Sequence, residues 1–248
     1  IVYTYTDEDR AGLEDLVSYW ENRSLECIAR RYFKEMGRGE ELDRAEEALL
    51  VTPMNFPTPE GRFVLDYEKV LRIGFNGILK EIEEGERRMK VVTMEDFRKV
   101  QFYKAARSCC EGIITWANNH ASLAERLAQK ESDLRRKKEL ERIAETSRWV
   151  PAHPPRTFYE ALQSFWFAHL AGLLESGAMG MSPGRFDQFM YPYYQNDRDI
   201  VSRGEVIELL ECLRIKFSEV QRITSRAWEG LSSGGLFQNM ILGGITPK

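Results

Sequence analysis

The chain has 248 residues, of which 43% are hydrophobic and 30% are charged, a composition typical of folded globular proteins and unlike disordered or collagen-like chains. Its 35 basic residues are balanced by 39 acidic ones, so the formal net charge is -4. Neither basic nor acidic residues dominate any long stretch of the sequence. A basic surface for phosphate backbones is therefore missing, and we expect no nucleic-acid partner.

The four cysteines, Cys27, Cys109, Cys110 and Cys212, show neither metal-binding nor disulfide-scaffold spacing. We expect reduced thiols and a cytoplasmic protein, with Cys27 and Cys212 in the core. No apolar run reaches the roughly 18–20 residues of a membrane span. The first residues do not resemble a signal peptide, so no membrane partner is expected. The histidines lack metal-ligand spacing, and we expect no bound metal or organic cofactor.

The first half of the sequence predicts a series of helices. Their starts are marked by polar residues that can cap free backbone amides, such as Thr6 with Asp9, Ser24, and Thr93 with Asp96. The three prolines of residues 51–61 predict an extended or turned segment. The expected helices cover about residues 7–19, 24–37, 66–84 and 93–129, followed by a charged, solvated helix that begins at Ser132.

The second half contains the most apolar helix. Thr157 and Glu160 form a T-x-x-E capping box before residues 158–175, which are apolar on nearly all sides and are predicted to be buried. Residues 175–184 are rich in glycine and predict a loop. A further helix is expected from Ser202 to about residue 221, and residues 237–244 predict a short buried strand.

Six strings of the sequence, in their order and spacing, are similar to strings of one known family. They are YEKVLRIGFNGIL (67–79), FYKAARSCCEGI (102–113), AHPPRTFYEALQSFWFAHL (152–170), SPGRFDQFMYPYYQND (182–197), LLECLRIKFSE (209–219) and FQNMILGG (237–244). From about residue 7 to its end, the chain resembles the dehydratase, lyase and decarboxylase branch of the glycyl radical enzymes, which are pyruvate formate-lyase-like. The start at Ile1 and the end at Lys248 suggest an N-terminal portion of such a polypeptide.

The resemblance implies a fold and a reaction. Family members are long chains with a ten-stranded α/β barrel, made of two five-stranded halves inside a helical shell. Residues 1–248 would be a partial domain of this kind: mainly α, comprising helical shell and the first strands, without an internal boundary. A glycyl radical near the C-terminus is installed by a radical S-adenosylmethionine activase and is passed to a cysteine on a barrel loop. The enzyme is expected to be anaerobic and homodimeric when complete.

The resemblance places no catalytic residue in this chain. The family's cysteine loop follows the strand at residues 237–244, and its radical glycine lies further on. Cys109 and Cys110 fall within a predicted helix, where the family commonly carries a cysteine without chemistry. We therefore expect both to be structural.

Six residues are expected to bind substrate by this resemblance. In the glycerol dehydratase-like members, a histidine and a serine that bind substrate hydroxyls stand where this chain has Met179 and Gly180. Unpaired hydroxyls would cost about 1–3 kcal/mol each, which disfavours a polyol substrate. The alternative is that the loop has shifted and Met179 only fills space. In the sequence, Arg62 is close to the position at which some dehydratases carry a substrate-facing histidine.

Tyr103, Arg107 and Glu111 are four residues apart and share one helix face. Tyr103 and Glu111 match a tyrosine and an aspartate that face the substrate in choline-cleaving members. Arg107 matches a turn that carries an arginine in sulfonate-cleaving members, so it could hold an anionic substrate. The alternative is a surface ion pair between Arg107 and Glu111. Arg185 and Asp187 are expected to fix the loop, and His169 to be a hydrogen-bonded core residue.

Two classes of function remain. The first is an incomplete glycyl radical lyase that cleaves a C–O, C–N, C–S or C–C bond of a small organic molecule, with an anionic substrate or an aryl carboxylate among the options. The second is a non-catalytic helical scaffold or binding module that retains only the shell of the barrel. A cysteine loop and a radical glycine beyond Lys248 would distinguish them.

Overall fold

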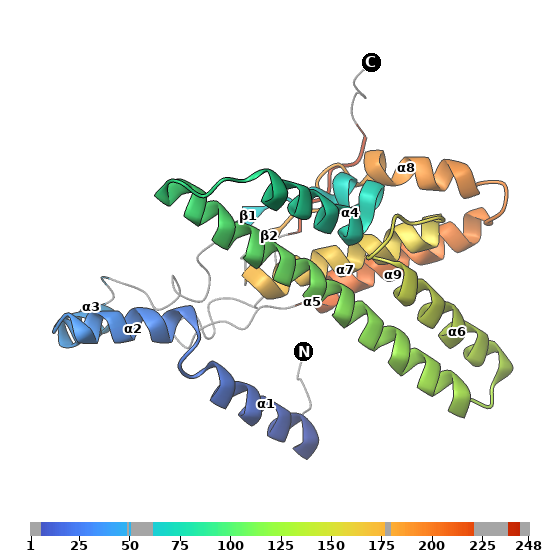
Figure 1. The fold of residues 1–248 in the computed structure, drawn as a ribbon. Helices are drawn as coiled ribbons and strands as arrows, with labels where there is room; N and C mark the ends of the chain where they lie inside the picture. The colour runs from blue at the N-terminus through green and yellow to red at the C-terminus, as the bar shows by residue number, and fades with distance from the viewer. Residues whose placement is uncertain (1–5, 49, 51–61, 177–179, 221–237, 244–248) are drawn as a thin grey trace. The chain divides into compact units, whose positions relative to one another are not determined.

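The computed structural model describes residues 6–48, 50, 62–176, 180–220 and 238–243. The chain divides into two compact units, and each is described by itself. Unit 1 contains the helices before residue 61, and unit 2 contains the helices and strands from residue 62 onward (Figure 1). The described part of the chain is mostly helical, which confirms the predicted α character.

Unit 1 contains α1 (Asp7–Trp20), α2 (Leu25–Glu35) and α3 (Gly39–Glu47). Thr6 and Asp9 form the predicted capping box of α1, and Ser24 caps α2. Helix α3 was not predicted from the sequence. It is joined to α2 by ion pairs of Arg30, whose guanidinium lies 2.8 Å from the carboxylate of Glu46.

Unit 2 contains six described helices and two short strands. They are β1 (Arg62–Phe63), α4 (Tyr67–Arg88), α5 (Met94–Lys130), α6 (Leu134–Trp149), α7 (Phe158–Ser176), β2 (Gly180–Met181), α8 (Phe186–Asp197) and α9 (Arg203–Glu219). The long helix α5 packs against α4 before its midpoint and forms an antiparallel hairpin with α6 beyond it (Figure 1).

The helix starts follow the capping chemistry of the sequence. The backbone nitrogen of Asp96 donates to Thr93 Oγ1 at 3.2 Å, and the Asp96 carboxylate accepts from the Thr93 nitrogen at 2.9 Å. Hydrogen bonds to its carboxylate from the hydroxyl and then the backbone nitrogen of Thr93 hold the pKa of Asp96 below its ordinary value. Helix α6 is capped by Asp133 rather than Ser132. Helix α8 was not predicted from the sequence, and it forms with Pro192 inside it.

The core of unit 2 forms around α7, as its apolar sequence predicts. Phe165 of α7 is fully buried, and its ring packs against the rings of Tyr67 from α4, Phe186 from α8 and Phe217 from α9. Aromatic side chains from four helices therefore meet at one point. Burial of such large apolar surfaces is the main stabilising contribution in a fold of this kind.

A kink in α4 fits the segment between α6 and α7 against it. Gly74 has a positive φ of 62°, and the backbone nitrogens of Phe75 and Asn76, released from the helix, donate to the carbonyl oxygens of Pro151 and Ala152 at 3.0 and 2.9 Å. A Cβ on Gly74 would lie 2.5 Å from the Ala152 oxygen. Only glycine fits both the space and the φ angle at this position.

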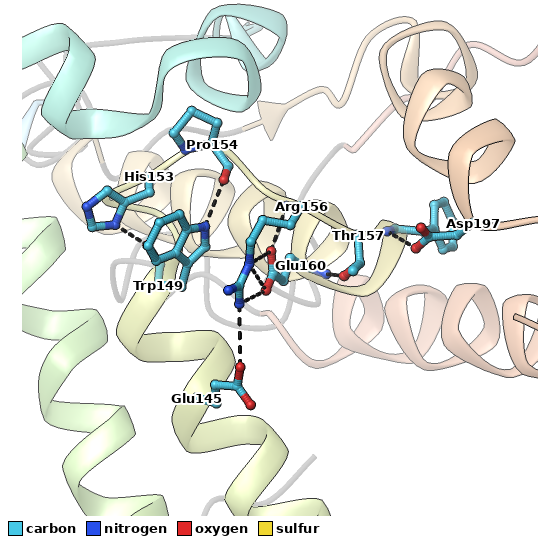
Figure 2. Close-up of polar contacts among 9 residues, drawn as sticks. Glu145, Trp149, His153, Pro154, Arg156, Thr157, Glu160 and Asp197 are labelled. Carbon is cyan, nitrogen blue, oxygen red and sulfur yellow. Dashed lines mark hydrogen bonds and ion pairs between the residues drawn. The ribbon is translucent and has the colours of Figure 1, made fainter. Parts of the chain in front are cut away.

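The PPRTFYEAL string forms the corner before α7 (Figure 2). The Glu160 carboxylate is almost fully buried and accepts from the Arg156 backbone nitrogen at 2.6 Å and from its guanidinium Nε at 3.0 Å. Thr157 Oγ1 accepts from the Glu160 nitrogen at 3.2 Å. The predicted capping box is therefore only half formed, because Glu160 binds Arg156 instead of the Thr157 nitrogen.

Three chain segments run parallel beside these helices. Strands β1 and β2 pair in parallel, with Arg62 opposite Gly180, and Gly184 forms a parallel bridge with Met240. The predicted buried strand at 237–244 is wrong in its described part, since residues 238–243 make one bridge only and the Leu242 side chain is 69% exposed. The barrel itself stays a prediction.

Candidate functional site

The structure brings together two of the expected substrate-binding residues that are far apart in the sequence. Arg62 of β1 and Gly180 of β2 are directly paired positions of the two parallel strands. Gly180 is buried, which leaves a backbone surface rather than a polar side chain at this position. Met179, which precedes Gly180, lies outside the described residues. Its expected role stays a prediction.

The second group lies on α5 and faces the C-terminal half of α4. The Tyr103 side chain is half-buried against the core, and its hydroxyl oxygen would be 2.6 Å from a Cβ on Gly85. One turn further, Arg107 Nη2 lies 2.6 Å from Glu86 Oε2, and Nη1 lies 3.5 Å from Glu83 Oε1. Tyr103 and Arg107 are therefore neighbours on one face, as their spacing predicts.

The predicted alternative partner of Arg107, Glu111, is not used. The ion pairs of Arg107 are with Glu83 and Glu86 of α4, and Glu111 is exposed. The hydrogen bond to Glu86 raises the pKa of Arg107 above its ordinary value, so the guanidinium remains charged. Its side chain is 30% exposed. A guanidinium has five N–H donors, so this one keeps donors for a further anion.

The two acidic partners were missed from the sequence. They belong to the run EIEEGERR at residues 81–88, which ends α4 one short turn before α5 begins. Two helices joined by so short a connection run antiparallel. The end of α4 must therefore lie beside the first turns of α5, and this signal could have indicated acidic partners for Arg107.

A groove of about 590 Å³ lies on another face of α5, between α4, α5 and α7. Ser108, Cys109 and Gly112 line it from α5, and Glu175 lines it from α7. Apolar side chains make up most of the remaining wall, including Phe75 and Trp116. Because residues are about 100° apart around a helix, this face is separate from the one that carries Tyr103 and Arg107.

The cysteines of α5 do not have the properties of nucleophiles. Cys110 is buried, and burial raises the pKa of its thiol to about 11. Cys109 is exposed on the groove, and partial burial together with Glu175 raises the pKa of this thiol as well. Both thiols are therefore protonated near neutral pH. The expectation that Cys212 lies in the core is wrong, because it is exposed on α9.

Within the described ranges, no group of three or more histidine, cysteine, aspartate or glutamate side chains could hold a metal ion. Among the same residues, no helix combines the length and the hydrophobicity needed to cross a lipid bilayer.

The fold matches a class of protein, the glycyl radical enzymes: the crystal structure of one from Archaeoglobus fulgidus covers 98% of this chain and 31% of its own with a TM-score of 0.74 and 26% identity. The pyruvate formate lyase-like family model matches residues 1–248. The chain belongs to this family.

Relatives of known activity agree with this assignment. Indoleacetate decarboxylase of Tractidigestivibacter scatoligenes is 32% identical over 100% of this chain and 28% of its own length. Isethionate sulfite-lyase of Desulfovibrio desulfuricans is 33% identical over 98% of this chain and 31% of its own length. The glycerol-bound structure of the B12-independent glycerol dehydratase from Clostridium butyricum matches with a TM-score of 0.79 and 32% identity, over 98% of this chain and 30% of that one.

The chain thus spans about three tenths of the length of these relatives. They are glycyl radical lyases of three kinds, a decarboxylase, a sulfite-lyase and a dehydratase. The family is therefore established, whereas the bond that is cleaved differs among its members.

Proposed function

We propose that this chain forms the helical shell and one wall of the substrate cavity of a glycyl radical lyase. The family match over all 248 residues carries this proposal. The complete enzyme would cleave a C–O, C–N, C–S or C–C bond of a small organic molecule. The glycyl radical, installed by a radical S-adenosylmethionine activase, supplies a thiyl radical that takes hydrogen from the substrate. The residues of this chain bind and orient that substrate.

The parallel segments support the placement of this chain at the start of the barrel. Strand β2 pairs with β1, and Gly184, three residues after β2, forms a parallel bridge with Met240. Parallel strands of this kind are joined by helical crossovers, here α4 to α7 and then α8 with α9. Such repeated crossovers build barrels and open parallel sheets in which substrates bind at strand ends.

Arg107 supports an anionic substrate. Its guanidinium is charged, partly exposed and held by Glu86 in one orientation, and a planar fork of N–H donors matches a carboxylate or a sulfonate. Both named curated relatives act on molecules with such a group, indoleacetate and isethionate. We therefore include Arg107 with Tyr103 in the wall that recognises the anionic end of the substrate.

Activation of the complete enzyme tests the function. The full-length protein would be incubated without oxygen with its activase and S-adenosylmethionine, and the radical measured by electron paramagnetic resonance. A glycyl radical signal and turnover of a small carboxylate or sulfonate are expected, with no comparable turnover of glycerol. A full-length protein that acquires no radical would instead be a scaffold that retains the shell of the barrel.

A further inference from the structure

Residues 238–243 are held mainly by polar contacts, because most of their apolar side chains are exposed. Ile241 and Leu242 have 53% and 69% of their surface exposed, and of the apolar side chains only Met240 is partly buried against the core, so hydrophobic burial alone specifies the register of this segment weakly. Polar groups of α7, α8 and the turn at Gly184 hold it instead. We call residues 238–243 the docked segment.

The first attachment is at Gln238. Its side-chain Nε2 donates to the carbonyl oxygen of Phe217 at 2.7 Å, so Oε1 must be the atom that faces His169. His169 Nε2 lies 2.8 Å from this Oε1 and must donate to it, because an amide oxygen only accepts. The imidazole is therefore protonated on Nε2.

The same chain of hydrogen bonds continues into α4. With its proton on Nε2, neutral His169 can only accept at Nδ1, where the hydroxyl of Tyr67 donates at 2.7 Å. His169 is fully buried, and burial lowers its pKa, which favours the neutral ring. Each hydrogen bond in the series from Tyr67 through His169 and Gln238 to Phe217 therefore has one possible donor and one possible acceptor. A slip of the docked segment by one residue would turn Gln238 away and leave a buried imidazole N–H unpaired.

The second attachment is at the other end of the docked segment. The backbone nitrogen of Gly243 donates to Asp187 Oδ2 at 2.6 Å, and that of Ile241 donates to the carbonyl oxygen of Gly184 at 2.8 Å. Asp187 Oδ1 is buried and has no hydrogen-bond partner among the described residues. Asp187 is the second residue of α8, so its position is set by a regular helix.

We propose that Gln238, through His169, and Asp187 are positioning residues that set the register and the direction of the docked segment. The proposal rests on the proposed function, in which the reactive cysteine follows this segment in the chain. Two attachments, one at each end, define both where the segment begins and the line along which it leaves residue 243. A single attachment would leave it free to pivot.

Amide hydrogen exchange of the full-length protein tests the attachments directly. Gln238→Met keeps the length of the side chain but removes both hydrogen bonds, and Asp187→Ala removes the other acceptor. Each should speed exchange at Ile241 and Gly243 by about tenfold or more, with the α5–α6 hairpin unchanged. Asp187→Asn keeps an acceptor oxygen and should retain most of the protection. Asn239→Ala, at an exposed neighbour, is the matched control.

Kinetics of the activated enzyme test the positioning role. Gln238→Met should lower kcat by about tenfold or more while KM stays within about twofold and the amount of glycyl radical is unchanged, since binding and activation do not use this contact. Unchanged exchange at Ile241 and Gly243 would overturn the attachments, and faster exchange with an unchanged kcat would overturn the positioning role. A wild-type protein without radical would contradict the proposed function alone, and the exchange result would still decide the attachments.

Discussion

The carboxylate of Asp197, at the end of α8, accepts a hydrogen bond from the backbone nitrogen of Phe158, the first residue of α7, at 2.6 Å (Figure 2). The first amides of a helix have no partner within the helix, and a buried one must be satisfied from outside. Asp197 is itself buried. The start of the central helix is therefore capped by a residue that lies 39 positions away in the sequence.

Asp197→Ala should lower the free energy of unfolding of the full-length protein by about 1–3 kcal/mol, because it leaves a buried amide without an acceptor. Urea denaturation would measure this. The matched control is Asp199→Ala, since Asp199 is 88% exposed and lies 3.8 Å from Arg198. That change should stay within about 0.5 kcal/mol. Equal effects of the two substitutions would contradict the capping role.

Two glycines within helices should respond to alanine in opposite directions. Gly74→Ala forces a side chain into a positive φ and against the Ala152 oxygen, so it should destabilise by about 1–3 kcal/mol or more. A Cβ on Gly112 of α5 would meet no heavy atom within 4 Å, so Gly112→Ala should stabilise by up to about 1 kcal/mol. Thermal or urea unfolding would measure both changes in stability. A tolerated Gly74→Ala would argue against the kink.

Local chemistry made most of the fold predictable from the sequence. The cap at Thr93 and the apolar surface of residues 158–175 depend on neighbours in the chain, and both were predicted correctly. Helix α8 was not predicted, and its interior proline, Pro192, is a residue that disfavours a helix locally. Core contacts around α7 supply stability that helix propensity does not measure.

The candidate site was less predictable, because its contacts join residues that are distant in sequence. Spacing placed Tyr103 and Arg107 on one helix face, and in the structure both contact α4, a partner that the spacing did not indicate. The same spacing offered Glu111 as a partner for Arg107, whereas tertiary packing supplied Glu86. Pairing of Arg62 with Gly180 depends on strand register, which no local pattern specifies.

Burial of His169 should make stability depend on pH. The fold lowers the pKa of this histidine below its ordinary 6.5, so the unfolded chain binds a proton more readily than the folded one. The free energy of unfolding therefore rises with pH between the lowered pKa of His169 and about 6.5. It falls as the pH drops below about 6.5, by at most about 1.4 kcal/mol per pH unit.

Replacement of His169 should remove that slope. His169→Gln lacks a titrating group, so its free energy of unfolding should vary less between pH 7 and 5 than that of the wild type, although it is lower at pH 7. His120→Gln, at an exposed position, serves as the control and should keep the wild-type slope. Urea denaturation at several pH values measures both. If the free energy of unfolding depended on pH in the same way in wild type and His169→Gln, His169 would not be the source of the pH dependence.

Arg107 gives the sharpest test of the substrate. If its guanidinium holds a carboxylate or sulfonate, Arg107→Lys in the full-length enzyme keeps the charge but loses the planar fork, and KM should rise by about tenfold or more. Arg107→Met should nearly abolish binding. Stability should change little, because the ion pair with Glu86 is partly solvated.

Two further variants separate recognition of the substrate from support of the helix pair. Glu86→Gln removes the charge of the nearer of the two acidic partners of Arg107 but keeps the guanidinium, so kcat/KM should stay within a few-fold of wild type if the substrate is the functional partner. Arg44→Met, in an exposed pair with Glu40, should leave the kinetics unchanged. Steady-state kinetics with the activated enzyme decide the question. If Arg107→Met keeps kcat/KM within about twofold of wild type, Arg107 serves only to join α4 and α5, and recognition of the anion lies elsewhere.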